Sequence, residues 1–252
     1  MGAVSQMSSL GLARAPLLAD LSQERLNQLA GLCAWRWFEP GQPLVCRNAA
    51  DSEVHLVIDG RVRIHVYSAD GREVLLTHVQ EGAIVGDFAA IDGGLRATDA
   101  HAATKVLSAA LPAAAFKLLL RSEPAVEERY VRYLVGLVRT LTDRVIELST
   151  LAVQSRIRAE LLRLVHAAEQ GNAARLEPPP RHADLAAQLG TSREQVTREF
   201  SVLVRQGVLA RSGAALVVSD VRRLEDLVRG EVPVSSSPSR RIPFRAASEK
   251  RQ

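Results

Sequence analysis

Short apolar runs and turn signals alternate along residues 36–111. The turns are Pro-Gly, Asp-Gly and Glu-Gly pairs, and the runs between them have the length of β-strands. Val62, Ile64 and Val66 alternate with polar residues, so we expect one face of that strand to be buried and the other to meet water. Regular short strands between such turns indicate a β-sandwich, barrel or roll.

The apolar period becomes helical near Pro112 and resumes after Pro124. Apolar residues then recur at alternating spacings of three and four, as in the seam of a two-stranded coiled coil. The expected seam consists of Val131, Leu134, Val138, Leu141, Val145 and Leu148. The alternative is a helix that packs against its own domain, but its length and polar flanks favour a seam between two copies of the chain. The sequence therefore predicts a homodimer.

A second helix is expected over residues 153–170, and a proline-rich loop leads from it into a compact helical unit. The last residues are rich in Ser, Pro and Arg and have no apolar period, so we expect a mobile basic tail. The predicted organisation is an effector-sensing domain at 1–123, a dimerisation helix at 124–152, a DNA-binding domain at 153–231 and the tail at 232–252.

Residues 181–200 have the spacing of a helix-turn-helix. Ala186 allows two helices to approach closely, Gly190 relieves the turn, and Val196 fixes the second helix on the first. Ser192, or Thr191, can cap the second helix. Beyond it, two short apolar runs flank a Ser-Gly pair at 212–213, which predicts a β-hairpin wing.

The second helix of this motif has two faces. The residues expected to face the core are Val196, Phe200, Leu203 and Val204, and those expected to face outward are Glu194, Thr197, Arg198, Ser201 and Arg205. An arginine on the outward face can bind guanine O6 and N7 together, and a glutamate can accept from the cytosine amino group. This chemistry suits a reader of the DNA major groove.

The amino-acid composition narrows the classes of protein to which the chain can belong. The 252 residues are 47% hydrophobic, which suffices for two cores, and the net charge of +4 is compatible with a nucleic-acid partner without proving one. The two cysteines are too few for a disulfide framework or an iron–sulfur cluster. We expect a cytoplasmic protein with no membrane segment, and no nucleophile elbow, P-loop, metal motif or dinucleotide fingerprint suggests an enzyme.

The segment Thr-Ser-Arg-Glu-Gln-Val-Thr-Arg at 191–198 resembles the recognition helix of the Crp/Fnr family of bacterial transcription regulators. The resemblance covers nearly the whole chain and implies an α+β fold with an N-terminal β-roll, a long dimerisation helix and a C-terminal winged helix-turn-helix. It implies that Arg193, Glu194 and Arg198 read a TGTGA-like half-site in double-stranded DNA, with RNA polymerase as a further partner of an activator. The residues assigned to DNA are Ser192, Arg193, Glu194, Thr197, Arg198 and Ser201.

Residues 82–98 resemble the family's phosphate-binding cassette. The resemblance implies that Arg96 holds the phosphate of cyclic AMP or cyclic GMP, that Asp87 replaces the usual glutamate on the ribose, and that Thr142 reaches the base. The residues assigned to the effector are Gly86, Asp87, Phe88, Arg96, Ala97 and Thr142. No other cofactor and no metal is expected, because the six histidines lack metal-ligand spacing.

Two positions depart from the cassette of cyclic-AMP binders. Asp87 is one methylene shorter than glutamate, and Ala97 removes a serine hydroxyl. Each lost charge-assisted hydrogen bond costs about 1.5 to 3 kcal/mol, or one to two decades of affinity. Cyclic nucleotide, another ligand and no ligand therefore remain open, as does an interaction module that responds to cyclic nucleotides without specific DNA binding.

Overall fold

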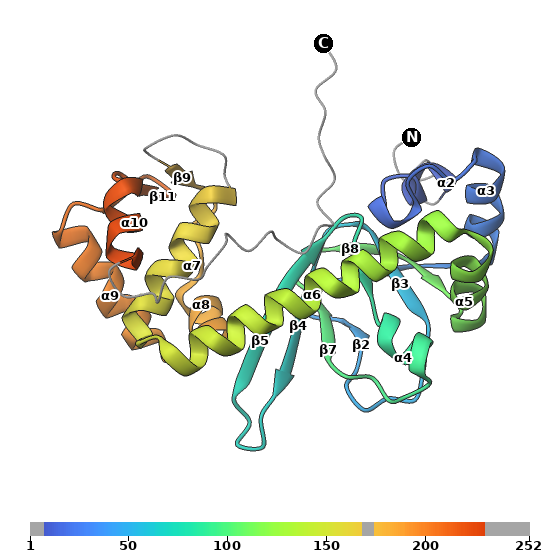
Figure 1. Ribbon diagram of the computed structural model, residues 1–252, viewed down its shortest axis with the longest axis horizontal. Coiled ribbons are helices and arrows are strands. Elements are labelled where there is room, and N and C mark those ends of the chain that lie inside the picture. Colours follow the sequence, from blue (N-terminus) through green and yellow to red (C-terminus); the bar gives the residue numbers. More distant parts are fainter. Residues whose placement is uncertain (1–7, 168–173, 230–252) are drawn as a thin grey trace, which may run out of the picture. The chain divides into compact units, whose positions relative to one another are not determined.

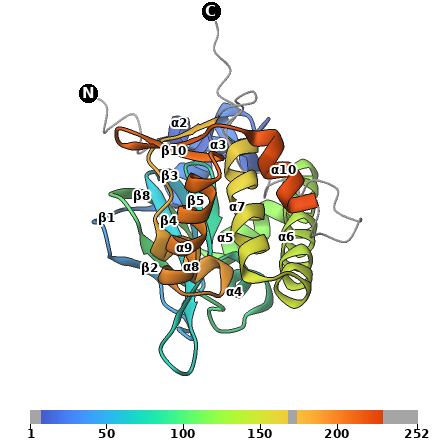
Figure 2. The same cartoon turned by 90° about the vertical axis from the view of Figure 1, so that its left-hand side faces the viewer.

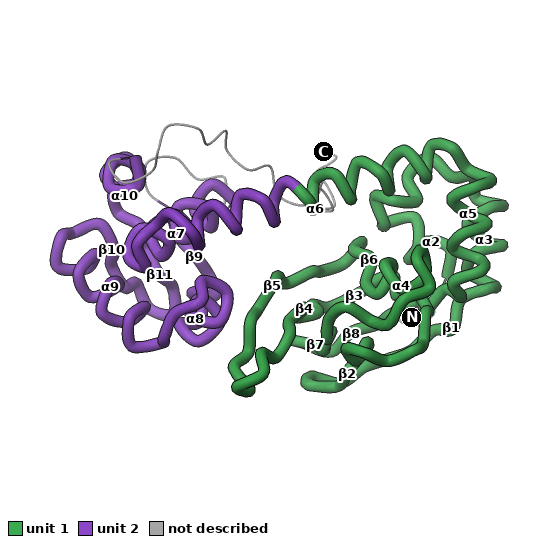
Figure 3. The backbone as a smooth tube through the Cα atoms, turned by 60° about the horizontal axis from the view of Figure 1, so that its bottom comes forward, with its two compact units in different colours: residues 1–138, 240–252 green, residues 139–239 purple. Residues whose placement is uncertain are grey.

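The computed structural model describes residues 8–167 and 174–229, which fall into two compact units. The units meet within one long helix, α6 (Pro124–Thr150), between Val138 and Arg139 (Figure 3). The expected tail at 232–252 lies outside the described residues. Within the described ranges, no helix is both long and apolar enough to cross a membrane.

The first unit is built on two four-stranded antiparallel sheets (Figure 1). In order across the sheet, the first contains β1 (Ala34–Phe38), β8 (Val106–Leu111), β3 (Val54–Asp59) and β6 (Ile84–Val85). The second contains β2 (Pro43–Val45), β7 (Asp99–Ala102), β4 (Arg61–Tyr67) and β5 (Glu73–Gln80). A small apolar core, including Val57 from one sheet and Val62 from the other, joins them. The predicted β-roll is confirmed.

Strand β4 departs from the simple alternation predicted for it. Its pairing with β5 shifts register between Ile64 and His65. The extra residue is Leu76 of β5, because Ile64 pairs with Thr77 and His65 with Leu75, and β4 itself stays in unbroken register with β7. Val62 is buried as expected, but His65, on the opposite face, is only 2% exposed, and Val66 is half-buried. The prediction that the face of His65 meets water is wrong at this residue, because the rings of Tyr67 and His101 pack on it with centroids 5.3 and 4.9 Å away.

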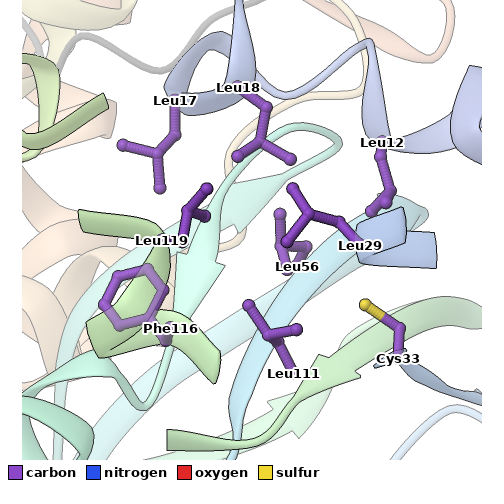
Figure 4. A pocket seen from close by; sticks show the side chains of 9 residues that line it. All are labelled: Leu12, Leu17, Leu18, Leu29, Cys33, Leu56, Leu111, Phe116 and Leu119. Atoms are coloured by element: carbon purple, nitrogen blue, oxygen red, sulfur yellow. The ribbon is translucent and has the colours of Figure 1, made fainter. Parts of the chain in front are cut away.

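Helices cover the first sheet. They are α2 (Ser9–Leu12), the short 3-10 helix η1 (Pro16–Leu18), α3 (Gln23–Leu32), α5 (Ala113–Ser122) and the beginning of α6. Their apolar residues surround a small pocket between α3, α5 and the sheet (Figure 4). Its lining is apolar apart from the Cys33 thiol, and burial raises the pKa of that thiol to about 12. Without polar groups to orient a ligand, the pocket is a gap in the packing.

The second unit contains the predicted winged helix-turn-helix. Its helices are α7 (Val153–Ala167), α8 (His182–Leu189), α9 (Arg193–Arg205) and α10 (Val221–Arg229), and α7 packs against the other three (Figure 2). The hairpin of β10 (Leu209–Ser212) and β11 (Ala215–Val218) is the predicted wing. A third strand, β9 (Ala174–Leu176), pairs with β11 and was not predicted.

Helix α6 exposes an apolar stripe. Its members are Val131, Val135, Val138, Leu141, Val145 and Leu148, each between 45% and 62% exposed. Leu134 was expected in this seam but packs, partly buried, against the core of the first unit. Val135 takes its place in the exposed stripe, because the helix covers its own domain with the neighbouring face.

Candidate DNA interface and effector site

The turn between α8 and α9 has the geometry that the sequence predicts. Gly190 ends α8 in the left-handed region with φ of 63°, where a side chain would be strained. The backbone amide of Thr191 donates to the carbonyl of Ala186 over 3.0 Å. Ser192 then caps α9, since its hydroxyl accepts from the amide of Gln195 over 3.2 Å. The two helices are therefore fixed as one rigid motif.

The inner face of α9 holds it on the unit. Val196, Phe200 and Leu203 are buried in the core, as predicted. Val204 is 47% exposed, so its assignment to that core is wrong; it lies beyond the edge of the buried arc. Glu199 was not singled out by the sequence, yet it is 5% exposed and its carboxylate accepts from Arg158 of α7 over 2.7 Å.

The outer face of α9 is polar and exposed. Its residues are Arg193, Glu194, Thr197, Arg198 and Ser201. Hydrogen bonds from its own backbone amide and then from Ser192 hold the pKa of Glu194 below its usual range, so this side chain is an ionised acceptor. The hydroxyls of Thr197 and Ser201 donate to carbonyls one turn earlier in the helix. The free chemistry of this face therefore lies in two guanidinium groups and one carboxylate.

His182 connects the two helices of the motif. Its Nδ1 lies 2.8 Å from the Thr197 hydroxyl, and its ring packs on Phe200 with centroids 4.5 Å apart. Because the Thr197 proton goes to the Arg193 carbonyl, Nδ1 is the donor in this contact. Burial, followed by Arg211 and Arg193, lowers the pKa of His182. The ring is therefore neutral at neutral pH and orients Thr197.

In the first unit, the cassette begins at a tight turn. Gly86 has φ of 83° and precedes the short helix α4 (Asp87–Asp92). A Cβ on Gly86 would lie 2.4 Å from Arg96 Nη1, so only glycine permits this approach. The sequence predicted this turn, but as a cradle for an anion; here the backbone carbonyl of Gly86 faces the cassette's own arginine.

Arg96 is buried, with 2% of its surface exposed. Its Nε and Nη2 both donate to one Asp51 oxygen, over 3.1 and 2.5 Å. Nη2 also donates to the carbonyl of Glu53 over 2.8 Å, and Nη1 donates to that of Gly86 over 2.5 Å. These contacts use four of the five guanidinium N–H groups. Arg96 thus fastens the loop before β3 to the cassette.

The other assigned cassette residues lie around this cluster. Asp87 is 5% exposed and accepts from the Tyr130 hydroxyl of α6 over 2.9 Å, and burial raises its pKa. Phe88 and Ala97 are exposed. Thr142 lies on α6, in the part of that helix that belongs to the other compact unit.

Asp51 and Tyr130 are the contacts that sequence reasoning missed. Neither belongs to a cassette motif, and their separations from Arg96 and Asp87 in the sequence carry no local periodicity.

The described residues hold no cluster of three or more His, Cys, Asp or Glu able to bind a metal. His65 and His101 do lie in contact, with ring centroids 4.9 Å apart, although their positions in the sequence have no metal-ligand spacing.

A β-roll joined through a long helix to a winged helix-turn-helix with an exposed polar face is the architecture of a DNA-binding transcription regulator with an additional β-roll domain. Comparison with known proteins agrees with this class of protein. Residues 35–123 match the cyclic nucleotide-binding domain model, and residues 155–227 match the Crp-like helix-turn-helix domain model. The chain belongs to the Crp/Fnr family of bacterial transcription regulators.

Individual relatives are distant but match almost end to end. The CRP-like cAMP-activated global transcriptional regulator of Mycobacterium tuberculosis is 25% identical over 84% of this chain and 96% of its own length. The cyclic AMP receptor protein of Thermus thermophilus is 27% identical over 85% and 97%. A mutant of CooA from Carboxydothermus hydrogenoformans has a TM-score of 0.73 at 18% identity, over 88% of this chain and 99% of its own. That last similarity supports the fold alone.

Proposed function

We propose that this regulator acts as a homodimer on a pseudo-palindromic, TGTGA-like DNA site. The observation that carries the proposal is the outer face of α9, where Arg193, Glu194 and Arg198 are exposed on a helix fixed from behind by buried residues. A rigid helix with two guanidinium groups and a carboxylate has the donors and acceptor that read guanine and cytosine edges. Ser192, Thr197 and Ser201 flank these three, and each of their hydroxyl oxygens keeps a lone pair that can accept from the amino group of a neighbouring base.

The dimer is proposed from the apolar stripe of α6. Side chains from Val131 to Leu148 recur at spacings of three and four and are about half exposed in the single chain. A second copy of the same helix covers such a stripe by coiled-coil packing. A two-fold dimer presents its two recognition helices about 34 to 36 Å apart, to successive major grooves. An activator of this kind would contact RNA polymerase from the DNA-bound state.

For the β-roll we propose an anionic effector of the cyclic nucleotide class. The support is the match of residues 35–123 to the cyclic nucleotide-binding domain model and the printed names of the two relatives, both of which refer to cyclic AMP. Arg96 provides the positive charge that a cyclic phosphodiester requires.

Selection of random DNA duplexes, read by sequencing, tests the DNA proposal. The wild type should enrich a two-fold symmetric motif, and Arg198→Ala should lose the preference at one guanine per half-site, at a cost of about 1 to 3 kcal/mol each. Arg223→Ala, on α10, is the matched control and should leave the motif unchanged. Identical motifs from the wild type and Arg198→Ala would refute α9 as the reader. No enriched motif, with and without cyclic nucleotide, would refute the regulator itself.

A further inference from the structure

We propose that Asp51 is a built-in counter-ion of the cassette arginine and that it sets the affinity of the β-roll for anionic ligands. The inference deepens the proposed effector class and rests on it. Asp51 lies in the loop before β3, 45 residues from Arg96 in the sequence, and it belongs to none of the motifs considered above.

The first argument is geometric. A guanidinium binds a carboxylate or phosphate best along an edge that offers two N–H groups together. In Arg96 the edge formed by Nε and Nη2 is taken by Asp51, and the remaining Nη2 donor is taken by the Glu53 carbonyl. A phosphate can therefore make a two-pronged contact with Arg96 only after the Asp51 carboxylate has moved away.

The second argument is electrostatic. The Arg96 side chain is 1% exposed, whereas that of Asp51 is 50% exposed. The arginine thus keeps its place inside the cassette, while its counter-ion stands at the surface and can swing into water. This asymmetry is what an exchangeable anion requires, because a departing carboxylate recovers its hydration and the buried cation receives a new partner.

Acidification does not open the site near neutral pH. The hydrogen bond from Arg96 holds the pKa of Asp51 below its usual range. The other charged groups nearby do not change this, since the Glu53 carboxylate is bound to Arg36 over 2.5 Å and burial lowers the pKa of His55 to about 4. Asp51 is therefore ionised whenever the protein meets a ligand, and the ligand has to compete with it.

Titration calorimetry of the full-length protein with cyclic AMP and with cyclic GMP tests the inference. Asp51→Asn removes the charge at nearly constant shape. The variant should bind cyclic AMP, cyclic GMP or both at least about 10-fold more tightly than the wild type does, because the ligand no longer competes with a charge-assisted hydrogen bond. The matched control is Glu53→Gln. It removes the charge of a carboxylate that lies two residues away and faces Arg36, so the affinity of this variant for cyclic nucleotide should stay within about twofold of that of the wild type. Adding Arg96→Ala to Asp51→Asn should abolish the gain.

The outcomes separate this inference from the proposals above. Binding by the wild type that Asp51→Asn leaves equal or weaker overturns the role of Asp51 while the effector class stands. Absence of binding by both proteins overturns both, and the DNA selection experiment still decides the regulator function. If Asp51→Asn does not fold, the wild type gives the answer: saturation with cyclic AMP should raise the pKa of the Asp51 carboxyl, followed by carbon NMR, and an unchanged pKa would refute the exchange.

Discussion

The cassette and the recognition helix each carry arginines that sequence motifs mark for an anion, and the structure places them in opposite environments. Arg96 in the first unit is 2% exposed and makes four hydrogen bonds within the protein. Arg193 and Arg198 in the second unit are exposed on α9. The same side chain is a structural clamp in one motif and an available donor in the other.

The difference follows from the backbone that carries each arginine. On α9, a helix of 13 residues with one buried face, periodicity alone decides which side chains point outward. Arg96 follows a short helix and a glycine-rich turn, where no period dictates direction, and a long flexible side chain bends toward whatever acceptors the fold offers. A motif on a regular helix or strand therefore predicts that its side chains are exposed and free to bind a ligand. A motif in a loop predicts only which residue types are present.

The largest expected difference between the two regions is in stability. Arg96→Ala should lower the free energy of unfolding by about 3 kcal/mol, because it removes the donors to the part-buried carbonyls of Gly86 and Glu53 and opens a cavity where the buried side chain lay. Arg198→Ala should change it by less than about 0.5 kcal/mol, as is usual for an exposed position. Urea denaturation followed by circular dichroism measures both. Equal losses would mean that Arg96 is not a structural clamp.

A second comparison lies within α9 itself. Glu199→Ala removes the buried carboxylate that accepts from Arg158, whose side chain is 12% exposed, and should cost about 3 kcal/mol. Glu194→Ala removes an exposed carboxylate and should change the DNA motif at a cytosine without changing stability. The double variant Arg158→Met with Glu199→Leu serves as the control, since apolar replacement of both partners should recover most of the loss. A double variant as unstable as Glu199→Ala would contradict this account.

The β-roll should also respond to acid. His55 is 2% exposed, its Nδ1 lies 3.1 Å from the Ser108 hydroxyl, and burial lowers its pKa to about 4. The unfolded chain takes up the proton near pH 6.5 and the folded chain only near 4, so this contribution to stability is present above pH 6.5 and is lost as the pH falls through that window.

Between pH 7 and 5, the wild type should lose about 2 kcal/mol more than His55→Gln. Both tryptophans, Trp35 and Trp37, lie on β1, so tryptophan fluorescence during urea unfolding reports on this unit. The buried carboxyl of Asp87 has a raised pKa and acts in the opposite direction, but it is common to both proteins and cancels in the comparison. Parallel pH profiles would show that the pKa of His55 is not lowered in the folded state.

The smallest expected effect compares two serine caps. Ser22 accepts from the amide of Arg25 in the first unit and Ser192 from that of Gln195 in the second, each over 3.2 Å. Replacement of either by alanine should cost about 1 kcal/mol. Only Ser192→Ala should also weaken DNA binding in an electrophoretic shift, because it frays the end of α9 that carries Arg193 and Glu194. Equal DNA affinity of the two variants would contradict this.

The order of elements, the β-roll, the helix-turn-helix with its wing and the outward face of α9 could all be predicted from the sequence. These rest on periods of two and 3.6, on turn residues and on a cap, all of which act between residues close in the chain. The prediction failed where packing within the first unit intervened: Tyr67 and His101 cover His65 on the outer face of β4, and Leu134 packs against the core of its own domain.

The contacts of the functional side chains, by contrast, depend on the folded chain and could not be predicted from the sequence. Asp51 meets Arg96 across 45 residues, Tyr130 meets Asp87 across 43, and Arg158 meets Glu199 across 41. No local pattern encodes such pairs, because burial in the folded chain, and not sequence spacing, obliges each charged or polar group to find a partner. The motif supplied the arginine of the cassette, and the fold determined that an aspartate of the same chain already holds it.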